Sequence, residues 1–323
     1  MTQITVNNLN KKYKTWQRGS GFKEIMKSLF KREYSEVHAV KNLSMEIEKG
    51  ELVGFIGPNG AGKSTTLKML SGVLYPTSGD VSILGMVPWR DRRRYVQYIG
   101  AVFGQKSQLI WDIPPLDSFM MNQAIYGVPD REFKATLENL SSILGVSDLM
   151  KQPTRKLSLG ERMKCEFIMA MLHQPLIVFL DEPTIGLDVI AKETIRKFIL
   201  EMNKKGVTFI LTTHDLADIE FLARRVIVIN HGEQIFDDDI KKLQNLFGAK
   251  KRIRLITAEP KIEIVLPGLE KIAEKSDFDT EYELDLEKTK LEKFITTASR
   301  KTRIEDMSIQ DVPIEQTIKV LYE

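Results

Sequence analysis

The chain has 323 residues, of which 42% are hydrophobic and 28% are charged. These fractions are typical of a globular protein and exclude a disordered or collagen-like chain. Lys and Arg number 47 against 44 Asp and Glu, and this net charge of +3 is too small to indicate nucleic acid as a partner. The single cysteine, Cys165, excludes an internal disulfide and fits a reducing compartment. The longest apolar run, Phe167–Leu172, is far below the roughly 20 residues that cross a bilayer, so we expect no membrane-spanning helix.

The first clear helical pattern lies in residues 22–31. Five apolar side chains share one face there, and lysines lie off that face. They are Phe22, Ile25, Met26, Leu29 and Phe30. A short basic amphipathic helix of this kind can lie on an anionic membrane or dock on a partner, or it can pack on its own domain. The sequence leaves these alternatives open.

Short apolar runs alternate with longer helical patterns up to about residue 238, which indicates an α/β domain whose sheet is covered on both faces. The predicted core strands are Leu52–Ile56, Tyr98–Phe103, Leu176–Leu180, Val207–Leu211 and Val226–Ile229. Residues of about 106–173 read instead as a helical subdomain inserted into this core. Its predicted helices are Leu116–Tyr126, Arg131–Leu144 and Glu161–Leu172.

Residues 239–323 have a different pattern of apolar residues, which predicts a separate small α+β domain. The expected strands are Arg252–Thr257, Ile262–Leu266 and Thr280–Asp285. Two apolar stripes predict helices. One stripe is formed by Leu291, Phe294, Ile295 and Ala298, and the other by Ile314, Ile318 and Leu321.

A phosphate-binding loop follows the first predicted core strand. Residues 57–65 match G-x-x-x-x-G-K-[ST], between a strand and a helix that begins near Gly62. Backbone N–H groups of such a loop bind phosphate oxygens, and the helix N-terminus adds positive potential. We expect Lys63 to bridge the β- and γ-phosphates and Ser64 to bind Mg²⁺. The expected nucleotide contacts are Gly57, Pro58, Asn59, Gly60, Ala61, Gly62, Lys63, Ser64 and Thr65.

Two carboxylates end the predicted strand Leu176–Leu180. We expect Asp181 to reach Mg²⁺ through water and Glu182 to polarise an attacking water. Without the phosphate loop, this pair could equally be an ordinary acidic strand end.

Four further motifs follow in a fixed order. They are Gln105, the segment Leu157-Ser158-Leu159-Gly160-Glu161, the segment Gly186-Leu187-Asp188, and His214. With the loop and the acidic pair, the sequence resembles the ATP-binding subunits of bacterial ABC transporters, of the exporter type with separate permease subunits. The resemblance covers about residues 1–238. It implies a P-loop NTPase core of the ABC ATPase type with an inserted helical subdomain.

The resemblance also implies roles that the spacing alone does not. In this family two ATPase copies face each other head to tail, and each ATP lies between one copy's phosphate loop and the other copy's signature segment. Ser158, Gly160 and Glu161 would then contact the ATP held by the partner copy, and Asp188 would contact the partner's loop. His214 would hold the γ-phosphate, and Gln105 would bind Mg²⁺ and report its presence to the helical subdomain.

The signature segment departs from the family's LSGGQ at two positions. Leu159 replaces a glycine and restricts the backbone, whereas Glu161 replaces a glutamine and would repel a triphosphate unless it points away. Members of the family also stack an aromatic ring on adenine. Tyr34 has the usual spacing for that role and is favoured, Tyr13 has the usual flanking pattern, and either could be a plain surface tyrosine.

We therefore expect an ATP-hydrolysing motor subunit that lies at the cytoplasmic face of the cell membrane without crossing it. Its partners would be integral-membrane permease subunits and a second ATPase copy or a related subunit, and the cargo a drug, a peptide or a lipid-like substrate. Export of a surface polysaccharide or teichoic acid is an alternative, as is a non-transport ABC ATPase switch. A single phosphate loop and the lack of sustained heptads weigh against the switch.

Overall fold

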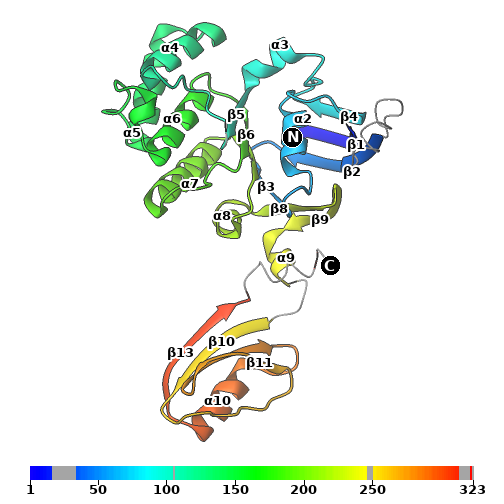
Figure 1. Cartoon of the computed structure of the whole chain (residues 1–323), viewed down its shortest axis with the longest axis vertical. Helices are drawn as coiled ribbons and strands as arrows, with labels where there is room; N and C mark the ends of the chain where they lie inside the picture. Colours follow the sequence, from blue (N-terminus) through cyan, green and yellow to red (C-terminus); the bar gives the residue numbers. More distant parts are fainter. Residues whose placement is uncertain (17–33, 105, 246–249, 313–320, 322–323) are drawn as a thin grey trace, which may run out of the picture. The chain divides into compact units, whose positions relative to one another are not determined.

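The computed structural model describes residues 1–16, 34–104, 106–245, 250–312 and 321 (Figure 1). Contacts divide the chain into two compact units, Met1–Asp237 (unit 1) and Asp238–Glu323 (unit 2). The predicted amphipathic helix at 22–31, Gln105, and the predicted helical stripe at Ile314 and Ile318 lie outside the described residues.

The centre of unit 1 is a six-stranded sheet with the order β5-β6-β7-β3-β8-β9. Its strands are β3 (Leu52–Ile56), β5 (Ile99–Phe103), β6 (Ile177–Asp181), β7 (Thr208–Thr212), β8 (Arg225–Asn230) and β9 (Glu233–Asp239). The strands from β5 to β8 pair in parallel. Strands β3 and β7 are buried along their whole length, which explains why they appear in the sequence as continuous apolar runs.

A second, antiparallel sheet with the order β2-β1-β4 was not predicted. It consists of β1 (Thr2–Trp16), β2 (Tyr34–Glu48) and β4 (Ser78–Ile83). Register shifts interrupt the alternation of apolar and polar residues along these strands. Their pattern in the sequence is therefore weak. Helix α2 (Lys63–Leu70) contacts β2 of this sheet and β6 and β7 of the other. One hydrophobic core, with Leu9, Phe55 and Leu67 among its members, therefore joins both sheets through α2.

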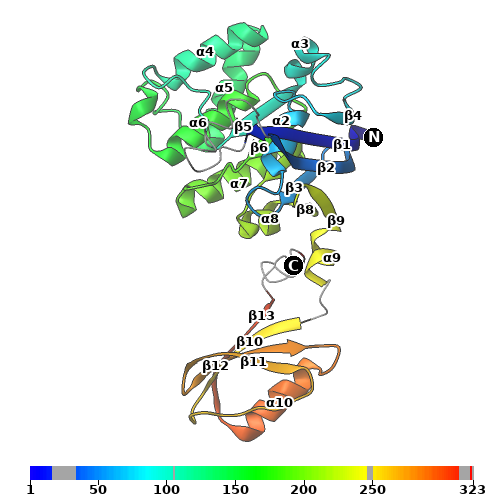
Figure 2. The same ribbon diagram turned by 45° about the vertical axis from the view of Figure 1, so that its right-hand side comes forward.

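The helical subdomain lies on the side of unit 1 away from the three-stranded sheet in both views (Figures 1 and 2). It contains α4 (Pro115–Tyr126), α5 (Asp130–Leu144), the short 3-10 helix η2 (Thr154–Lys156) and α6 (Leu159–Met171). Unit 1 also includes α3 (Arg92–Tyr95), η1 (Val96–Tyr98), α7 (Val189–Lys204) and α8 (Leu216–Leu222). None of the helices in the described ranges combines the length and the apolar composition needed to cross a membrane.

Unit 2 begins with α9 (Ile240–Asn245) and then forms a four-stranded antiparallel sheet with the order β11-β12-β10-β13. The strands are β10 (Lys250–Thr257), β11 (Leu269–Ser276), β12 (Asp279–Asp285) and β13 (Ile304–Asp311), and α10 (Leu291–Lys301) completes the unit. Alternate residues of β10 and β12, such as Ile253 and Tyr282, form a core with Phe294 and Ala298 of α10. The role of this unit stays a prediction.

One strand predicted for unit 2 is wrong. Residues Ile262–Leu266 are not a strand. Two of their carbonyl groups accept from side chains instead of a neighbouring strand, since Tyr282 Oη donates to Ile262 O and Lys301 Nζ donates to Glu263 O. Their apolar side chains Ile262, Ile264 and Leu266 pack on the core of the unit without a ladder of hydrogen bonds. The helix predicted from Leu291, Phe294, Ile295 and Ala298 is present as α10, and within this stripe Ile295 is 38% exposed whereas Phe294 and Ala298 are fully buried.

Replacing Phe294 by Ala should lower the free energy of unfolding of unit 2 by about 3–5 kcal/mol, because a fully buried aromatic ring is lost. Ile295→Ala is the matched control and should cost under about 1 kcal/mol, since this side chain is partly in water. Hydrogen exchange of β10 and β12, followed by mass spectrometry, measures both changes. Equal protection in the two variants would contradict the described helix face.

Candidate functional site

The phosphate loop turns between β3 and α2. Gly62 caps α2 with a φ of 108°, and a Cβ atom there would lie 2.3 Å from the backbone oxygen of Ala39. Only glycine satisfies both conditions. The loop and the residues facing it line a pocket of about 430 Å³. Its lining is Ala39, Asn59, Gly60, Ala61, Gly62, Lys63, Ser64, Thr65, Glu182, Ile185 and His214.

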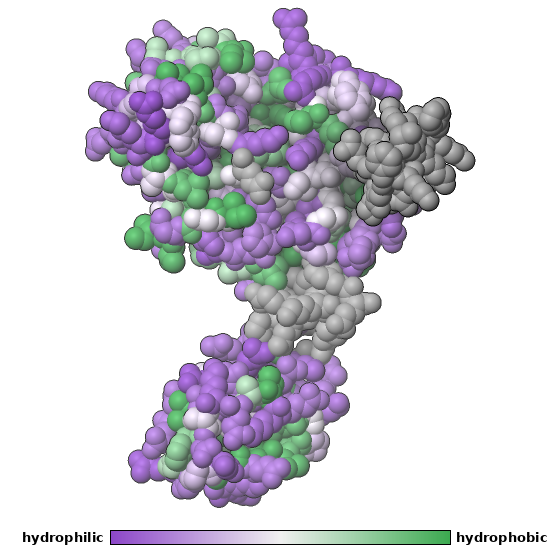
Figure 3. All heavy atoms as spheres, in the orientation of Figure 1, coloured by the Kyte–Doolittle hydropathy of each residue, from purple (hydrophilic) through white to green (hydrophobic). Residues whose placement is uncertain are grey.

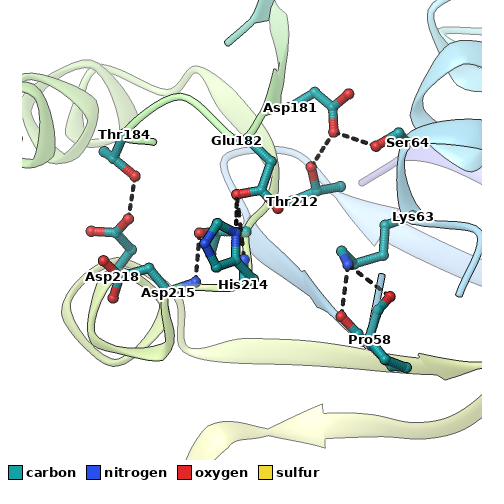
Figure 4. A network of polar contacts seen from close by, with 12 residues as sticks. Pro58, Lys63, Ser64, Asp181, Glu182, Thr184, Thr212, His214, Asp215 and Asp218 are labelled. Atoms are coloured by element: carbon teal, nitrogen blue, oxygen red, sulfur yellow. Dashed lines mark hydrogen bonds and ion pairs between the residues drawn. The ribbon is translucent and has the colours of Figure 1, made fainter. Parts of the chain in front are cut away.

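Lys63 lies inside the loop with only 7% of its surface exposed. Its Nζ atom donates to the backbone oxygens of Gly57 at 2.6 Å and Pro58 at 3.2 Å (Figure 4). Burial lowers the pKa of the Lys63 ammonium, and the nearby carboxylates of Glu182 and Asp181 act in the opposite direction. The result is a buried cation at the base of the loop, held by neutral carbonyl groups.

Asp181 links the phosphate loop to the central sheet through two hydrogen bonds. Its Oδ1 atom accepts from Ser64 Oγ at 2.8 Å and from Thr212 Oγ1 at 2.5 Å (Figure 4). Thr212 ends β7 and pairs in register with Asp181 at the end of β6. Thr212 was not among the predicted site residues. Its place directly before Thr213 and His214 was the available signal, but only the strand register shows that it faces Asp181.

Glu182 follows β6 with a φ of 53°, a left-handed conformation that is uncommon for a residue with a side chain. Its N–H group donates to Thr212 O at 2.9 Å, which fixes this turn against the neighbouring strand. The carboxylate faces His214, whose Nδ1 atom lies 2.8 Å from Glu182 Oε2 (Figure 4). Glu182 is largely shielded at 17% side-chain exposure, whereas His214 is 57% exposed. The sequence predicted both residues, and the structure places them in contact.

A buried carboxylate missed by the sequence analysis connects the segments that carry Glu182 and His214. Asp218 is fully buried in α8 and accepts a hydrogen bond from Thr184, two residues after Glu182 (Figure 4). Asp218 also forms an ion pair with Arg196 of α7. The Thr184–Asp218 hydrogen bond therefore joins the segment after Glu182 to the segment after His214, at a position outside the pocket.

A second missed carboxylate, Glu166 of α6, is 4% exposed and holds the segment that follows Gln105. It accepts from the Ser107 hydroxyl and from the Gln108 N–H at 3.1 Å. Burial raises the pKa of the Glu166 carboxyl, while these hydrogen bonds act in the opposite direction. The helix that begins at the signature segment is thus attached to the loop that the resemblance assigns to nucleotide sensing.

The signature segment forms the start of α6. Ser158 and Glu161 make a capping box: Ser158 Oγ accepts from Glu161 N at 3.3 Å, and Glu161 Oε2 accepts from Ser158 N at 2.8 Å. Leu159 is the first helical residue, and its φ is not positive, so the backbone restriction expected from replacing glycine has no effect. Among the described residues that line the phosphate pocket, none belongs to this segment.

Gly160 and Asp188 connect the signature segment to α7. A Cβ atom on Gly160 would lie 2.8 Å from Ala191 Cβ, so the two helices approach too closely for any side chain. Asp188 caps α7 by accepting from Ala191 N at 2.9 Å. The predicted partner contacts Ser158 and Asp188 are therefore carried by one packed pair of helix starts.

The adenine contact stays a prediction. Tyr34 begins β2, but its side chain is outside the described part of the chain. Tyr13 lies on β1, opposite Val37, and is 37% exposed. Lys11 Nζ lies 5.2 Å from the centre of the Tyr13 ring. The magnesium role predicted for Gln105 likewise stays a prediction.

The fold and the pocket together define a P-loop ATPase. The family model described as ABC transporter matches residues 40–185. The ABC transporter ATP-binding protein NatA of Bacillus subtilis is 33% identical over 207 residues, which cover 64% of this chain and 84% of NatA. The chain belongs to the ATP-binding proteins of ABC transporters.

Two further similarities extend this result. The linearmycin resistance ATP-binding protein LnrL of Bacillus subtilis is 27% identical over 289 residues, covering 88% of this chain and 92% of LnrL. This alignment is longer than unit 1, so it reaches into unit 2. A dimeric post-hydrolysis state of an ATP-binding cassette, bound to ADP and Pi, has a TM-score of 0.62 at 24% identity and covers 73% of this chain and 98% of that one. The predicted fold class is confirmed, and the chain is an ATP-hydrolysing subunit of a transporter.

Thr184→Val removes the hydroxyl that donates to buried Asp218 and keeps the side-chain shape. We expect the free energy of unfolding to fall by about 1.5–3 kcal/mol, the usual worth of a hydrogen bond to a charged group. We also expect kcat for ATP hydrolysis to fall, because Glu182 and His214 lose a common support. Urea unfolding and steady-state ATPase assays measure the two effects. Thr184→Ser keeps the donor and should behave like the wild type; equal losses in both variants would refute this role of the hydroxyl.

Proposed function

We propose that this chain drives export by hydrolysing ATP in a head-to-tail pair of ATPase copies that act on permease subunits. The observation that carries the proposal is a division of the predicted ATP contacts into two groups. Lys63, Glu182 and His214 line one pocket, whereas Ser158 and Asp188 lie at the joined starts of α6 and α7. A second copy would bring its own helix starts to this pocket.

In the pocket, Glu182 is the proposed general base. Its carboxylate is shielded from water, as a base near a reacting phosphate requires, and it is oriented by the contact with His214. His214 would hold the γ-phosphate through the part of its ring that is exposed. Lys63 would exchange the neutral carbonyls of Gly57 and Pro58 for phosphate oxygens, which are stronger acceptors for a cation.

Ser64 and Asp181 fit a Mg²⁺ ion. They bring two hard oxygen donors within 2.8 Å of each other beside the phosphate loop. Within the described residues no cluster of three or more His, Cys, Asp or Glu could hold a metal. Beyond Ser64, Asp181 and the predicted ligand Gln105, the remaining ligands would be phosphate and water oxygens. Mg²⁺ in nucleotide sites is usually bound in this way, by few protein groups and the substrate. Bound Mg²⁺ would neutralise charge on the phosphates.

Exposed apolar side chains support both proposed contacts. Val189 and Ile190, directly after Asp188, are 79% and 76% exposed, which suits a surface that a second copy covers. Further exposed apolar residues gather on α4 and the loop before it, where Figure 3 shows hydrophobic atoms among hydrophilic ones. They are Ile110, Trp111, Met120, Met121 and Ile125. We assign this second surface to the permease, which would hold the chain at the cytoplasmic face of the membrane.

The proposed cargo is a drug, a peptide or a lipid-like molecule. Its support is the similarity to LnrL, whose name records resistance to linearmycin and whose alignment includes part of unit 2. Co-purification with the permease, followed by ATPase assays with candidate cargoes, tests this assignment. If only polysaccharide precursors stimulated the ATPase activity, a polysaccharide would replace the drug, peptide or lipid-like molecule as the proposed cargo.

Glu182→Gln should lower kcat for ATP hydrolysis by about 10²–10⁴, because the amide cannot accept a proton from water. ATP binding should remain, since Lys63 and the loop are unchanged. Phosphate release and nucleotide-binding assays distinguish the two steps. Glu201→Gln is the control: this partly exposed residue lies outside the pocket, pairs with Lys205 and should affect neither step. Normal phosphate release from Glu182→Gln would remove Glu182 as the base.

A mixture of two inactive variants tests the head-to-tail pair. Lys63→Ala and Ser158→Ala should each abolish most activity when present in both copies. A mixed pair has one composite site with both defects and one that is intact, so a 1:1 mixture should recover about a quarter of wild-type activity by random pairing. ATPase assays before and after mixing measure the recovery. If the mixture stays as inactive as its components, the two groups do not act across copies.

A further inference from the structure

The first turn of α6 has few donors left for an incoming anion. A helix start carries N–H groups without intrahelical partners, and these make it a site for negative charge. Here the Ser158 N–H is taken by the Glu161 carboxylate, and the Glu161 N–H is taken by the Ser158 hydroxyl. The hydroxyl proton of Ser158 and the N–H groups of Leu159 and Gly160 remain for a phosphate.

The Glu161 carboxylate also places a full negative charge at this helix start. It bends back to Ser158 N, 2.8 Å away, rather than pointing out along the helix. No Lys or Arg within the described residues forms an ion pair with it, and the adjacent Arg162 guanidinium lies over the Trp111 ring, 5.5 Å from its centre. The charge that favours the helix by itself therefore opposes a second anion at the same end.

We propose that Glu161 weakens the ATP-bound pair of copies, by setting an uncompensated carboxylate against the γ-phosphate held by the partner. This inference rests on the proposed head-to-tail pair. Its effect is that the closed pair is less stable than one in which residue 161 is neutral, so the pair reopens more readily after each turnover.

The substitution Glu161→Gln tests this proposal, because glutamine keeps the capping box and removes only the charge. The hydrolysis-deficient Glu182→Gln variant is compared with the double variant Glu182→Gln/Glu161→Gln, and pair formation is measured against ATP concentration by analytical ultracentrifugation. We expect the double variant to need about fivefold less ATP at low salt. The difference should shrink in 1 M salt, where the screening length is about 3 Å.

Glu161→Gln should lower the thermal midpoint only slightly, because it keeps the cap and loses only the favourable interaction of the charge with the helix start. Glu161→Ala, which also loses the cap, should lower the midpoint further. If the single and double variants need the same ATP concentration to pair at low salt, the inference about Glu161 is wrong, whereas the proposed head-to-tail pair still stands. A difference that persists unchanged in 1 M salt would also overturn it, because the effect would not be electrostatic. If Glu182→Gln forms no ATP-dependent pair at all, the proposed function fails and the inference with it.

Discussion

The parallel pairing of β3, β7 and β6 is the constraint on which the site depends. Neighbouring parallel strands end at the same edge of a sheet, and ligands bind outside those carboxyl ends. The phosphate loop, the Asp181–Glu182 pair and the Thr212–His214 segment therefore reach one pocket, although they are far apart in sequence. The register also sets the chemistry, because a slip of one residue in β6 would turn Asp181 to the opposite face and separate it from Ser64.

Buried and partly buried carboxylates hold the surroundings of this edge in place. Asp181 joins the loop helix to β7, Asp218 joins the segments after Glu182 and His214, and Glu166 holds the segment after Gln105 to α6. Each of the three accepts hydrogen bonds from hydroxyl or N–H groups, which offsets the cost of burying its charge. Glu182 and His214 can therefore stay partly exposed, because hydrogen bonds outside the pocket fix the backbone of their segments.

The sequence predicted the central strands to within about one residue, because runs buried on both faces are continuously apolar. It also predicted the pocket residues whose spacing follows from a strand, a tight turn and a helix, such as Lys63 and Glu182. It did not predict Thr184 and Asp218, which are 34 residues apart and are isolated polar residues in the linear chain. The strand predicted at Ile262–Leu266 was wrong for a related reason: alternation reports an extended backbone facing a core, and the hydrogen-bond partner is set by tertiary structure.

The close approach of Gly160 to Ala191 has a mechanical consequence. The starts of α6 and α7 pack so closely that not even a Cβ atom fits on residue 160. This contact sets the separation of Ser158 and Asp188 before any partner arrives. In the proposed head-to-tail pair, a neighbouring copy would therefore meet both groups as one preformed surface rather than as two independent contacts.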